Sequence, residues 1–235
     1  MENIKGIIFD YGGTIDSRGT HWSEIIWDGY RASGVEIDKD TFREAYVYAE
    51  RELAKVRHIM PDDNFYVLLL KKMKIELTHL ADNGAVKREA VDTLAPDIAK
   101  YCYDQARQCI EEARPTLKAL YEKYPMVLVS NFYGNVESVL RDFNLRHYFK
   151  DIIESAVVGV RKPDPRIFGL GVEALHLKPE EVLVVGDSYK KDIVPAESIG
   201  CKVAWLKGKG WTADEDAVMH PSIIKKLADV LDAAL

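Results

Sequence analysis

The sequence is poor in cysteine and lacks the patterns that would give cysteines a structural role. Its 235 residues include three, Cys102, Cys109 and Cys201. The odd number and the absence of a C-x-x-C pair argue against a disulfide framework and against a zinc site. Cys102 and Cys109 are seven residues apart, a spacing that places both on one face of a helix. Such thiols suit a reducing compartment, so the sequence predicts a cytoplasmic protein.

Basic blocks and long apolar runs are also missing. The 32 basic and 38 acidic residues are interspersed and give a net charge of −6, which argues against nucleic acid as a partner. The longest aliphatic run, near residues 67–70, is far too short to cross a bilayer. The amino terminus has no signal-peptide pattern, because its apolar run stops at Asp10. A hydrophobic content of 47% is enough for one sizeable core or two modest domains.

The segment KGIIFDYGGTIDS, residues 5–17, carries the first functional signal. Residues 7–9 are apolar with β-branched members, which is typical of a strand buried in a parallel sheet. This strand ends at Asp10, and Gly12 and Gly13 follow. An acid at the carboxyl end of a buried strand lies where open α/β sheets bind ligands. An Asp-capped turn is the alternative interpretation of this segment alone.

Helical spacing of apolar residues replaces strand patterns over residues 22–112. The fourth helical stretch is expected over residues 86–113, with Pro96 as a kink or as the first turn of a new helix. Another helix is expected over residues 115–124, with Pro115 at its first position. The pattern predicts a helical block of about ninety residues inserted directly after the first strand.

Strands and helices alternate in the rest of the chain, which predicts an α/β fold with a doubly wound, mostly parallel Rossmann-like sheet. Strands are expected at residues 126–129, 152–158, 182–185 and 202–206. Helices are expected at residues 134–143, 166–175, 189–199 and 222–235. The strand expected at residues 182–185 is followed by Gly186 and Asp187, so an acid lies at its end, as at the end of the first strand.

Polar residues follow three of the expected strands: Asp10, Ser130, Asn131 and Asp187. In a parallel sheet these strand ends share one edge. Neighbouring carboxylates raise one another's pKa unless a cation lies among them, so Asp10, Asp187 and Asp192 predict a site for a hard divalent ion, best Mg²⁺. Lys162 and the Ser130 hydroxyl would then serve an anionic group. The alternative is that Asp187 and Asp192 cap a helix and that Lys162 is a surface lysine.

Four motifs occur in order: D-Y-G-G-T at residues 10–14, S-N at 130–131, K-P-D-P-R-I-F at 162–168, and G-D-S at 186–188 followed by Asp192. Together they resemble the four motifs of the haloacid dehalogenase-like hydrolase superfamily. The helical insert resembles the α-helical cap of its phosphoglycolate phosphatase and β-phosphoglucomutase branch. On this resemblance, residues 1–15 and 113–235 form the catalytic core and residues 16–112 form the cap.

The resemblance implies a Mg²⁺-dependent phosphohydrolase that acts on a small phosphorylated metabolite, with no nucleic-acid or membrane partner. Asp10 is the implied nucleophile and forms an aspartyl-phosphate. Ser130 and Lys162 are implied to hold the phosphoryl oxygens and to stabilise charge in the transition state. The implied Mg²⁺ ligands are Asp10, the Gly12 carbonyl, Asp187 and, in direct or supporting contact, Asp192. Asn131 and Thr14 are candidates to donate to the phosphate or the nucleophile, or to shape the turn.

Gly12 departs from the family motif, because most phosphatases of the superfamily have a second Asp there that protonates the leaving alkoxide and later activates water. General acid–base catalysis is typically worth about two to four orders of magnitude in rate. Three interpretations stay open. The substrate has a good leaving group, as an acyl phosphate has; or His21, Glu24 or a cap carboxylate supplies the acid; or the protein is a catalytically impaired binder or regulator.

Two other branches of the superfamily also lack the second Asp. Haloacid dehalogenases have Tyr there and lack the G-D pair of the fourth motif, whereas Gly186 and Asp187 are present here. Phosphonoacetaldehyde hydrolases have Ala there and use a cap lysine as a Schiff base. The lysines of the expected cap include Lys55, Lys71, Lys72 and Lys74. None is flanked by glycine in their way, so solvated surface lysines are expected, and carbon–phosphorus cleavage remains a minor alternative.

Overall fold

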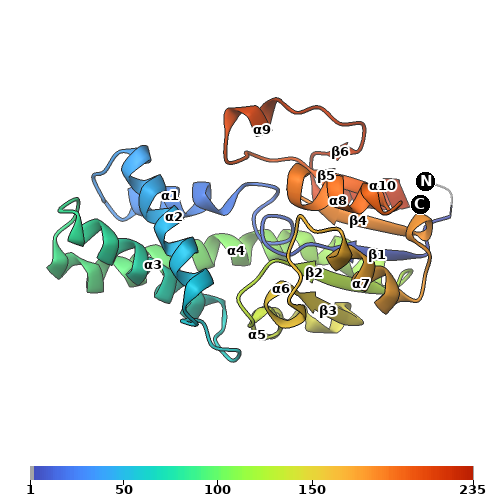
Figure 1. The fold of residues 1–235 in the computed structure, drawn as a ribbon, viewed down its shortest axis with the longest axis horizontal. Helices are drawn as coiled ribbons and strands as arrows, with labels where there is room; N and C mark the ends of the chain where they lie inside the picture. Colours follow the sequence, from blue (N-terminus) through green and yellow to red (C-terminus); the bar gives the residue numbers. More distant parts are fainter. Residues whose placement is uncertain (1–2, 235) are drawn as a thin grey trace.

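The computed structural model describes residues 3–234, so residues 1, 2 and 235 of the predicted core lie outside the described part. The described chain forms an α/β core and a helical cap that lie side by side along the long axis of the molecule (Figure 1). The fold class predicted from the sequence is therefore confirmed. No described helix combines the length and the apolar character needed to cross a membrane.

The core is built on one sheet, which has six parallel strands within the described residues and the order β3-β2-β1-β4-β5-β6. Their bounds are β1 (Gly6–Phe9), β2 (Met126–Ser130), β3 (Asp151–Glu154), β4 (Val182–Gly186), β5 (Lys202–Leu206) and β6 (Ile223–Ile224). The chain adds β2 and β3 on one side of β1 and then crosses to β4 on the other. Ligands bind at the carboxyl ends of strands where the order reverses in this way, which here is the edge between β1 and β4.

Helices cover both faces of the sheet, as expected for a doubly wound fold. The helices of the core are α5 (Val136–Asp142), α6 (Ser155–Val158), α7 (Arg166–Leu175), α8 (Val194–Ser198), α9 (Ala213–Ala217) and α10 (Val230–Ala234). Ile7 and Phe9 belong to the apolar cluster that includes α5, whereas Ile8 packs in the cluster of α7 and α8. Successive side chains of a strand point to opposite faces, so a strand covered on both faces is apolar throughout.

The cap consists of α1 (Trp22–Ala32), α2 (Lys39–Lys55), α3 (Phe65–Asp82) and the first part of α4 (Val91–Tyr121). The side chains of His21, Asp38 and Asn64 cap the first three of these helices by accepting a backbone N–H. Such caps satisfy donors that have no partner within the helix. Each helix then buries one apolar face against its neighbours in the cap.

Helix α4 is continuous from Val91 to Tyr121, so the prediction of two separate helices over residues 86–113 and 115–124 is wrong. Pro96 and Pro115 both lie inside it. Pro115 has no N–H to donate to the preceding turn, a local cost that made a helix start the natural expectation. Burial of its long apolar face outweighs that cost. The predicted cap boundary at residues 112 and 113 falls within this helix and stays a prediction.

Short elements account for the other differences from the sequence-based expectation. The strand expected over residues 152–158 ends at Glu154 and gives way to α6. A single helix was expected over residues 222–235, of which residue 235 lies outside the described part. The structure instead has the two-residue strand β6 at the start of this segment and the short helix α10 at its end. Helix α9 was not expected at all. A two-residue strand and one-turn helices carry too few residues to show a period of 2 or of 3.6.

Candidate functional site

Three acids meet where the strand order reverses. Asp10 directly follows β1, Asp187 directly follows β4, and Asp192 lies in the π-helical turn η4 (Tyr189–Ile193). One carboxylate oxygen from each lies within 4.8 Å of the others. Burial, followed by the charges of Asp10 and Asp192, raises the pKa of Asp187 well above its usual value. A cation would relieve this repulsion, and the all-oxygen donor set fits a hard divalent ion such as Mg²⁺.

Lys162 is the positive charge of the site. Its Nζ lies 2.6 Å from Oδ1 of Asp10 and 2.6 Å from Oδ1 of Asp192, and its side chain is 3% exposed. Burial lowers the pKa of Lys162, but the two carboxylates outweigh this effect and raise the pKa above its usual value. The ammonium is therefore held charged beside Asp10, where a phosphoryl group would lie.

Hydroxyl groups orient the Asp10 carboxylate from two sides. The Thr14 hydroxyl lies 3.1 Å from Oδ2 of Asp10 and 3.2 Å from Oδ1 of Asp187. The Ser130 hydroxyl donates to Oδ1 of Asp10 at 3.3 Å. The Asn131 side chain instead holds the backbone of Lys162, donating to its carbonyl at 3.1 Å and accepting from its N–H at 2.9 Å. Thr14, Ser130 and Lys162 thus contact the Asp10 carboxylate, and Asn131 holds Lys162 beside it.

Two glycines allow the acids to approach the backbone closely. Gly13 has φ of +98°, and a Cβ there would overlap the Asp187 carboxylate. A Cβ at Gly186 would overlap the side chain of Asp192 in the same way. Any larger residue at either position would displace an acid of the site.

A cavity of about 730 Å³ lies between the cap and the core and reaches Asp10, Lys162 and Asp187. Apolar side chains from the cap and one from the core form part of its wall: Trp22, Ile26, Phe65, Leu68, Leu69 and Phe132. An apolar wall with a few polar groups at one end is typical of a site for a small organic ligand.

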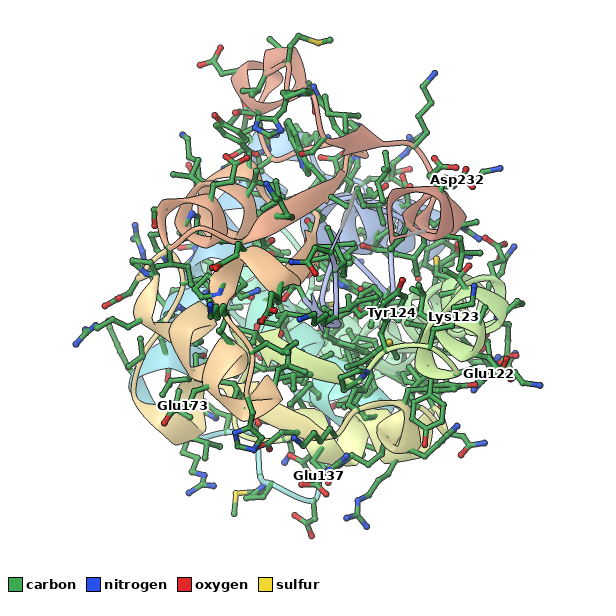
Figure 2. The ribbon with its side chains drawn as sticks, turned by 90° about the vertical axis from the view of Figure 1, so that its right-hand side faces the viewer. Glu122, Lys123, Tyr124, Glu137, Glu173 and Asp232 are labelled. Atoms are coloured by element: carbon green, nitrogen blue, oxygen red, sulfur yellow. The ribbon has the colours of Figure 1, made fainter. Side chains whose placement is uncertain are left out.

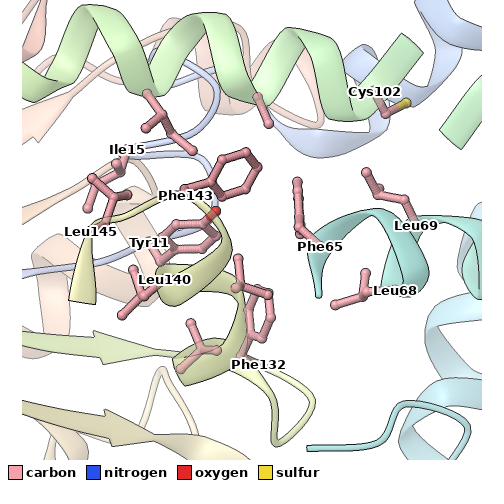
Figure 3. Close-up of a cluster of buried hydrophobic side chains, with 14 of the residues drawn as sticks. Tyr11, Ile15, Phe65, Leu68, Leu69, Cys102, Phe132, Leu140, Phe143 and Leu145 are labelled. Atoms are coloured by element: carbon pink, nitrogen blue, oxygen red, sulfur yellow. The ribbon is translucent and has the colours of Figure 1, made fainter. Parts of the chain in front are cut away.

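Aromatic packing connects this cavity wall to the core (Figure 3). The Tyr11 ring centroid lies 6.3 Å from that of Phe65, which belongs to the cap, and 5.7 Å from that of Phe132. Both pairs meet edge to face, a favourable arrangement of aromatic quadrupoles. The residue next to Asp10 is therefore packed directly against the cap helix α3.

The cavity lining also has polar members, among them Lys72, which is only 4% exposed. The prediction that it is a solvated surface lysine is wrong: it forms an ion pair with Glu50 and lies 4.2 Å from the ring centroid of Tyr46. Tyr133 of the core donates to Glu50 at 2.9 Å and so joins core to cap. Burial lowers the pKa of Lys72, but Glu50 outweighs this and raises it. A Schiff-base lysine requires the opposite shift, which argues against the phosphonoacetaldehyde hydrolase alternative.

The candidates for the acid that Gly12 cannot supply differ in their positions. The Glu24 carboxylate lies between Lys39 and Lys209, outside the cavity lining, and these cations outweigh its burial and lower its pKa. His21 lines the cavity, but burial lowers its pKa to about 4, so its ring is neutral at pH 7. Asp16, which the sequence analysis did not single out, is 1% exposed and lines the cavity. An Asp in a polar loop resembles an ordinary turn residue, so no sequence signal distinguished it.

Comparisons with known proteins agree with this geometry. The family described as haloacid dehalogenase-like hydrolase matches residues 4–200. The chain is 39% identical over 203 residues to the glyceraldehyde 3-phosphate phosphatase of Methanopyrus kandleri, covering 84% of this chain and 81% of that protein. It is 29% identical over 216 residues to haloacid dehalogenase-like hydrolase domain-containing protein 3 of Bos taurus, covering 86% and 82%.

The structure of the HAD-hydrolase YfnB from Bacillus subtilis, solved bound to magnesium, has the same fold, with a TM-score of 0.64 and 18% identity over 99% of both chains. The match over residues 4–200 extends from β1 through the cap to the turn that carries Asp192. It includes all four motifs that the fold gathers at one sheet edge. The chain therefore belongs to the haloacid dehalogenase-like hydrolases, and its fold carries a helical cap after the first motif.

Proposed function

We propose that this protein is a Mg²⁺-dependent phosphatase that hydrolyses a small phosphorylated metabolite through an aspartyl-phosphate on Asp10. The observation that carries the proposal is the position of Asp10 beside the charged Lys162 at the end of a cavity that the cap covers. The 39% identical relative is a phosphatase of a phosphorylated three-carbon metabolite, which supports this class of substrate. The buried, free cysteines support a cytoplasmic location.

In the proposed reaction, an Asp10 oxygen attacks phosphorus, the ester P–O bond breaks, and water later cleaves the aspartyl-phosphate. Thr14 and Ser130 orient the nucleophile, and Lys162 stabilises the charge on the phosphoryl oxygens. Asp10, the Gly12 carbonyl and Asp187 would hold Mg²⁺ with support from Asp192, and the ion would neutralise phosphoryl charge. Asn131 keeps Lys162 in place through its backbone.

The cavity supports a small substrate rather than a macromolecule, since its volume of about 730 Å³ suits a metabolite. Residues 16–112 are proposed as the cap that closes over this substrate and excludes water. The alternative from a different class, a binder of phosphorylated ligands without turnover, rests on Gly12 alone.

A screen of phosphorylated metabolites, with Mg²⁺ or with EDTA, tests the proposal. Wild-type protein should release phosphate from at least one compound only with Mg²⁺, and Asp10→Asn should release none. Glu173→Gln is the matched control, because it removes one negative charge from an exposed position at the far end of the core (Figure 2). Binding of a phosphorylated metabolite without any release of phosphate would favour the non-catalytic alternative.

A further inference from the structure

Gly12 leaves a space beside the nucleophile that the indole of Trp22 borders. A Cβ at Gly12 would meet only Cδ1 and Nε1 of Trp22, at 3.9 and 4.0 Å. Both distances are ordinary van der Waals contacts, and Gly12 is not among the glycines with positive φ. The backbone therefore accepts a side chain at this position, and the absence of the second Asp has no steric cause.

Asp16 lies on the other side of the same indole nitrogen. Trp22 Nε1 is 3.1 Å from each Asp16 carboxylate oxygen, and the Gly13 N–H donates to Oδ1 at 2.7 Å. Two donors thus hold the carboxyl group next to the peptide that follows Gly12. Asp16 also lines the cavity that contains Asp10, although the residue is only 1% exposed.

Among the described residues, Oδ2 of Asp16 accepts one hydrogen bond, from the Trp22 indole N–H, which also donates to Oδ1. A carboxyl oxygen can take part in more than one hydrogen bond, so Oδ2 retains capacity for a substrate oxygen or a water. No ion pair with a described lysine, arginine or histidine neutralises Asp16, in contrast to Asp10 and Asp192. The group is thus buried, held in place and without a counter-charge.

Such surroundings favour the protonated acid. Burial, with a further contribution from the Asp10 charge, raises the pKa of Asp16 to about 7, although the Gly13 and Trp22 donors act in the other direction. The other titratable groups that face it are Tyr11 and Cys109, both neutral at pH 7 because burial raises their pKa. Arg18, which lies near Cys109, donates from Nη2 to Oε1 of Glu112 at 2.6 Å, so its charge is paired with that carboxylate. An acid–base catalyst works best with a pKa near the operating pH.

We propose that Asp16, reaching the active site from four residues beyond Gly12, is the proton donor and acceptor that replaces the second Asp of the family motif. This inference rests on the proposed phosphatase function. As the ester P–O bond breaks, the Asp16 proton passes to the leaving oxygen and yields the free alcohol. The Asp16 carboxylate then takes a proton from the water that attacks the aspartyl-phosphate, and free Asp10 and inorganic phosphate result.

A structural role makes a different prediction, because Asp16 also holds the Gly13 turn and Trp22. Asp16→Asn keeps an oxygen that can accept from the Gly13 and Trp22 N–H groups but cannot transfer a proton. Loss of proton transfer should lower kcat/KM, which reports the steps up to the phosphorylation of Asp10, only for substrates with basic leaving groups. Disorder of the turn should lower kcat/KM for all substrates alike. Glu76→Gln is the matched control, since Glu76 is also buried with a pKa raised to about 7 and lies outside the cavity lining.

The experiment compares glycerol phosphate with nitrophenyl phosphate, which leaves without a proton. Asp16→Asn should lower kcat/KM for glycerol phosphate by about 10²- to 10⁴-fold and change kcat/KM for nitrophenyl phosphate less than about threefold. Glu76→Gln should leave kcat/KM unchanged for both substrates. An equal loss on both substrates, or no loss on glycerol phosphate, would overturn the role of Asp16 while leaving the phosphatase function intact. Absence of hydrolysis by the wild type overturns both.

Gly12→Asp provides a second test that does not depend on the folding of Asp16→Asn. If Asp16 already supplies the proton, a second acid adds little, and the rate on glycerol phosphate should rise less than about threefold. A gain of about 100-fold, restricted to glycerol phosphate, would show that the wild type has no effective acid and would overturn the assignment.

Discussion

The core and the cap both bury charged side chains, but they balance them differently. At the core edge, Asp10, Asp187 and Asp192 face a single cation, Lys162, so negative charge is in excess. In the cap, Lys72 is paired with Glu50, while the Tyr30 hydroxyl donates a hydrogen bond to Oε2 of Glu76 at 3.2 Å. A metal ion can neutralise the excess of negative charge at the core edge, whereas the charges of the cap come close to internal balance.

The surface of the core completes this contrast. Glu122 directly follows α4, Glu137, Glu173 and Asp232 lie on α5, α7 and α10, and all four are exposed (Figure 2). Water screens charges at such positions, so they perturb one another little. At the core edge, buried acids gather where parallel strands end beside one another, and there the repulsion between them favours the binding of a cation.

Of the changes considered, removal of the divalent ion from the acids at the core edge should have the largest effect, a loss of phosphatase activity. EDTA should reduce phosphatase activity by about three orders of magnitude or more, because metal stabilisation of phosphoryl charge is worth several kcal/mol. Added Mg²⁺ should restore the activity of the wild type but not of Asp187→Ala. Phosphate release assays measure both results, and full activity in EDTA would contradict the metal site.

Glu76→Gln tests the charge balance of the cap. Burial raises the pKa of Glu76 from 4.5 to about 7, so between these values the folded protein holds a proton that the unfolded chain releases. Its contribution to stability is full below about pH 4.5 and is lost as pH rises through about 7. The loss amounts to roughly 3 kcal/mol. In urea unfolding, the free energy of unfolding of Glu76→Gln relative to that of the wild type should be higher at pH 8 than at pH 5. An equal difference at both pH values would contradict the raised pKa of Glu76.

Lys72→Met breaks the ion pair of the cap without a large change in side-chain volume. The change should lower the free energy of unfolding by about 1–3 kcal/mol, less than for a fully buried pair because the Glu50 side chain is 31% exposed. The matched control is Lys74→Met, whose lysine is 51% exposed and pairs with an exposed Asp92. Thermal unfolding measures both, and similar effects of the two variants would remove the distinction between a buried and a surface lysine.

Tyr11→Phe should give the smallest effect, and it should be stabilising. The Tyr11 side chain is buried in the aromatic cluster where cap meets core, and its hydroxyl has no hydrogen-bond partner among the described residues (Figure 3). Removing an unsatisfied buried hydroxyl should raise stability by up to about 1 kcal/mol. For a chain of this size the midpoint of thermal unfolding should then rise by about 2–4 °C. A fall in the midpoint would indicate a partner for this hydroxyl.

The elements that could be predicted from sequence are those with strong local patterns. The strand at residues 202–206 and the helix at residues 166–175 have in the structure the bounds expected for them. The proximity of Asp10 and Asp187 also followed from local information, because the carboxyl ends of parallel strands share an edge. In contrast, Pro115 indicated a helix start that the packing of α4 overrides.

By itself, the sequence determined the α/β class, the insert after the first strand and the identity of the acids at the sheet edge, because each depends on a short-range period or on a residue at a strand end. Only the tertiary structure decided which polar side chains of the insert and loop are buried. Lys72 meets Glu50 across 22 residues of sequence, and Asp16 gains its environment from Trp22 and from the core around Asp10. The charge state of a group depends on what surrounds it in space, and a linear pattern contains no record of those neighbours.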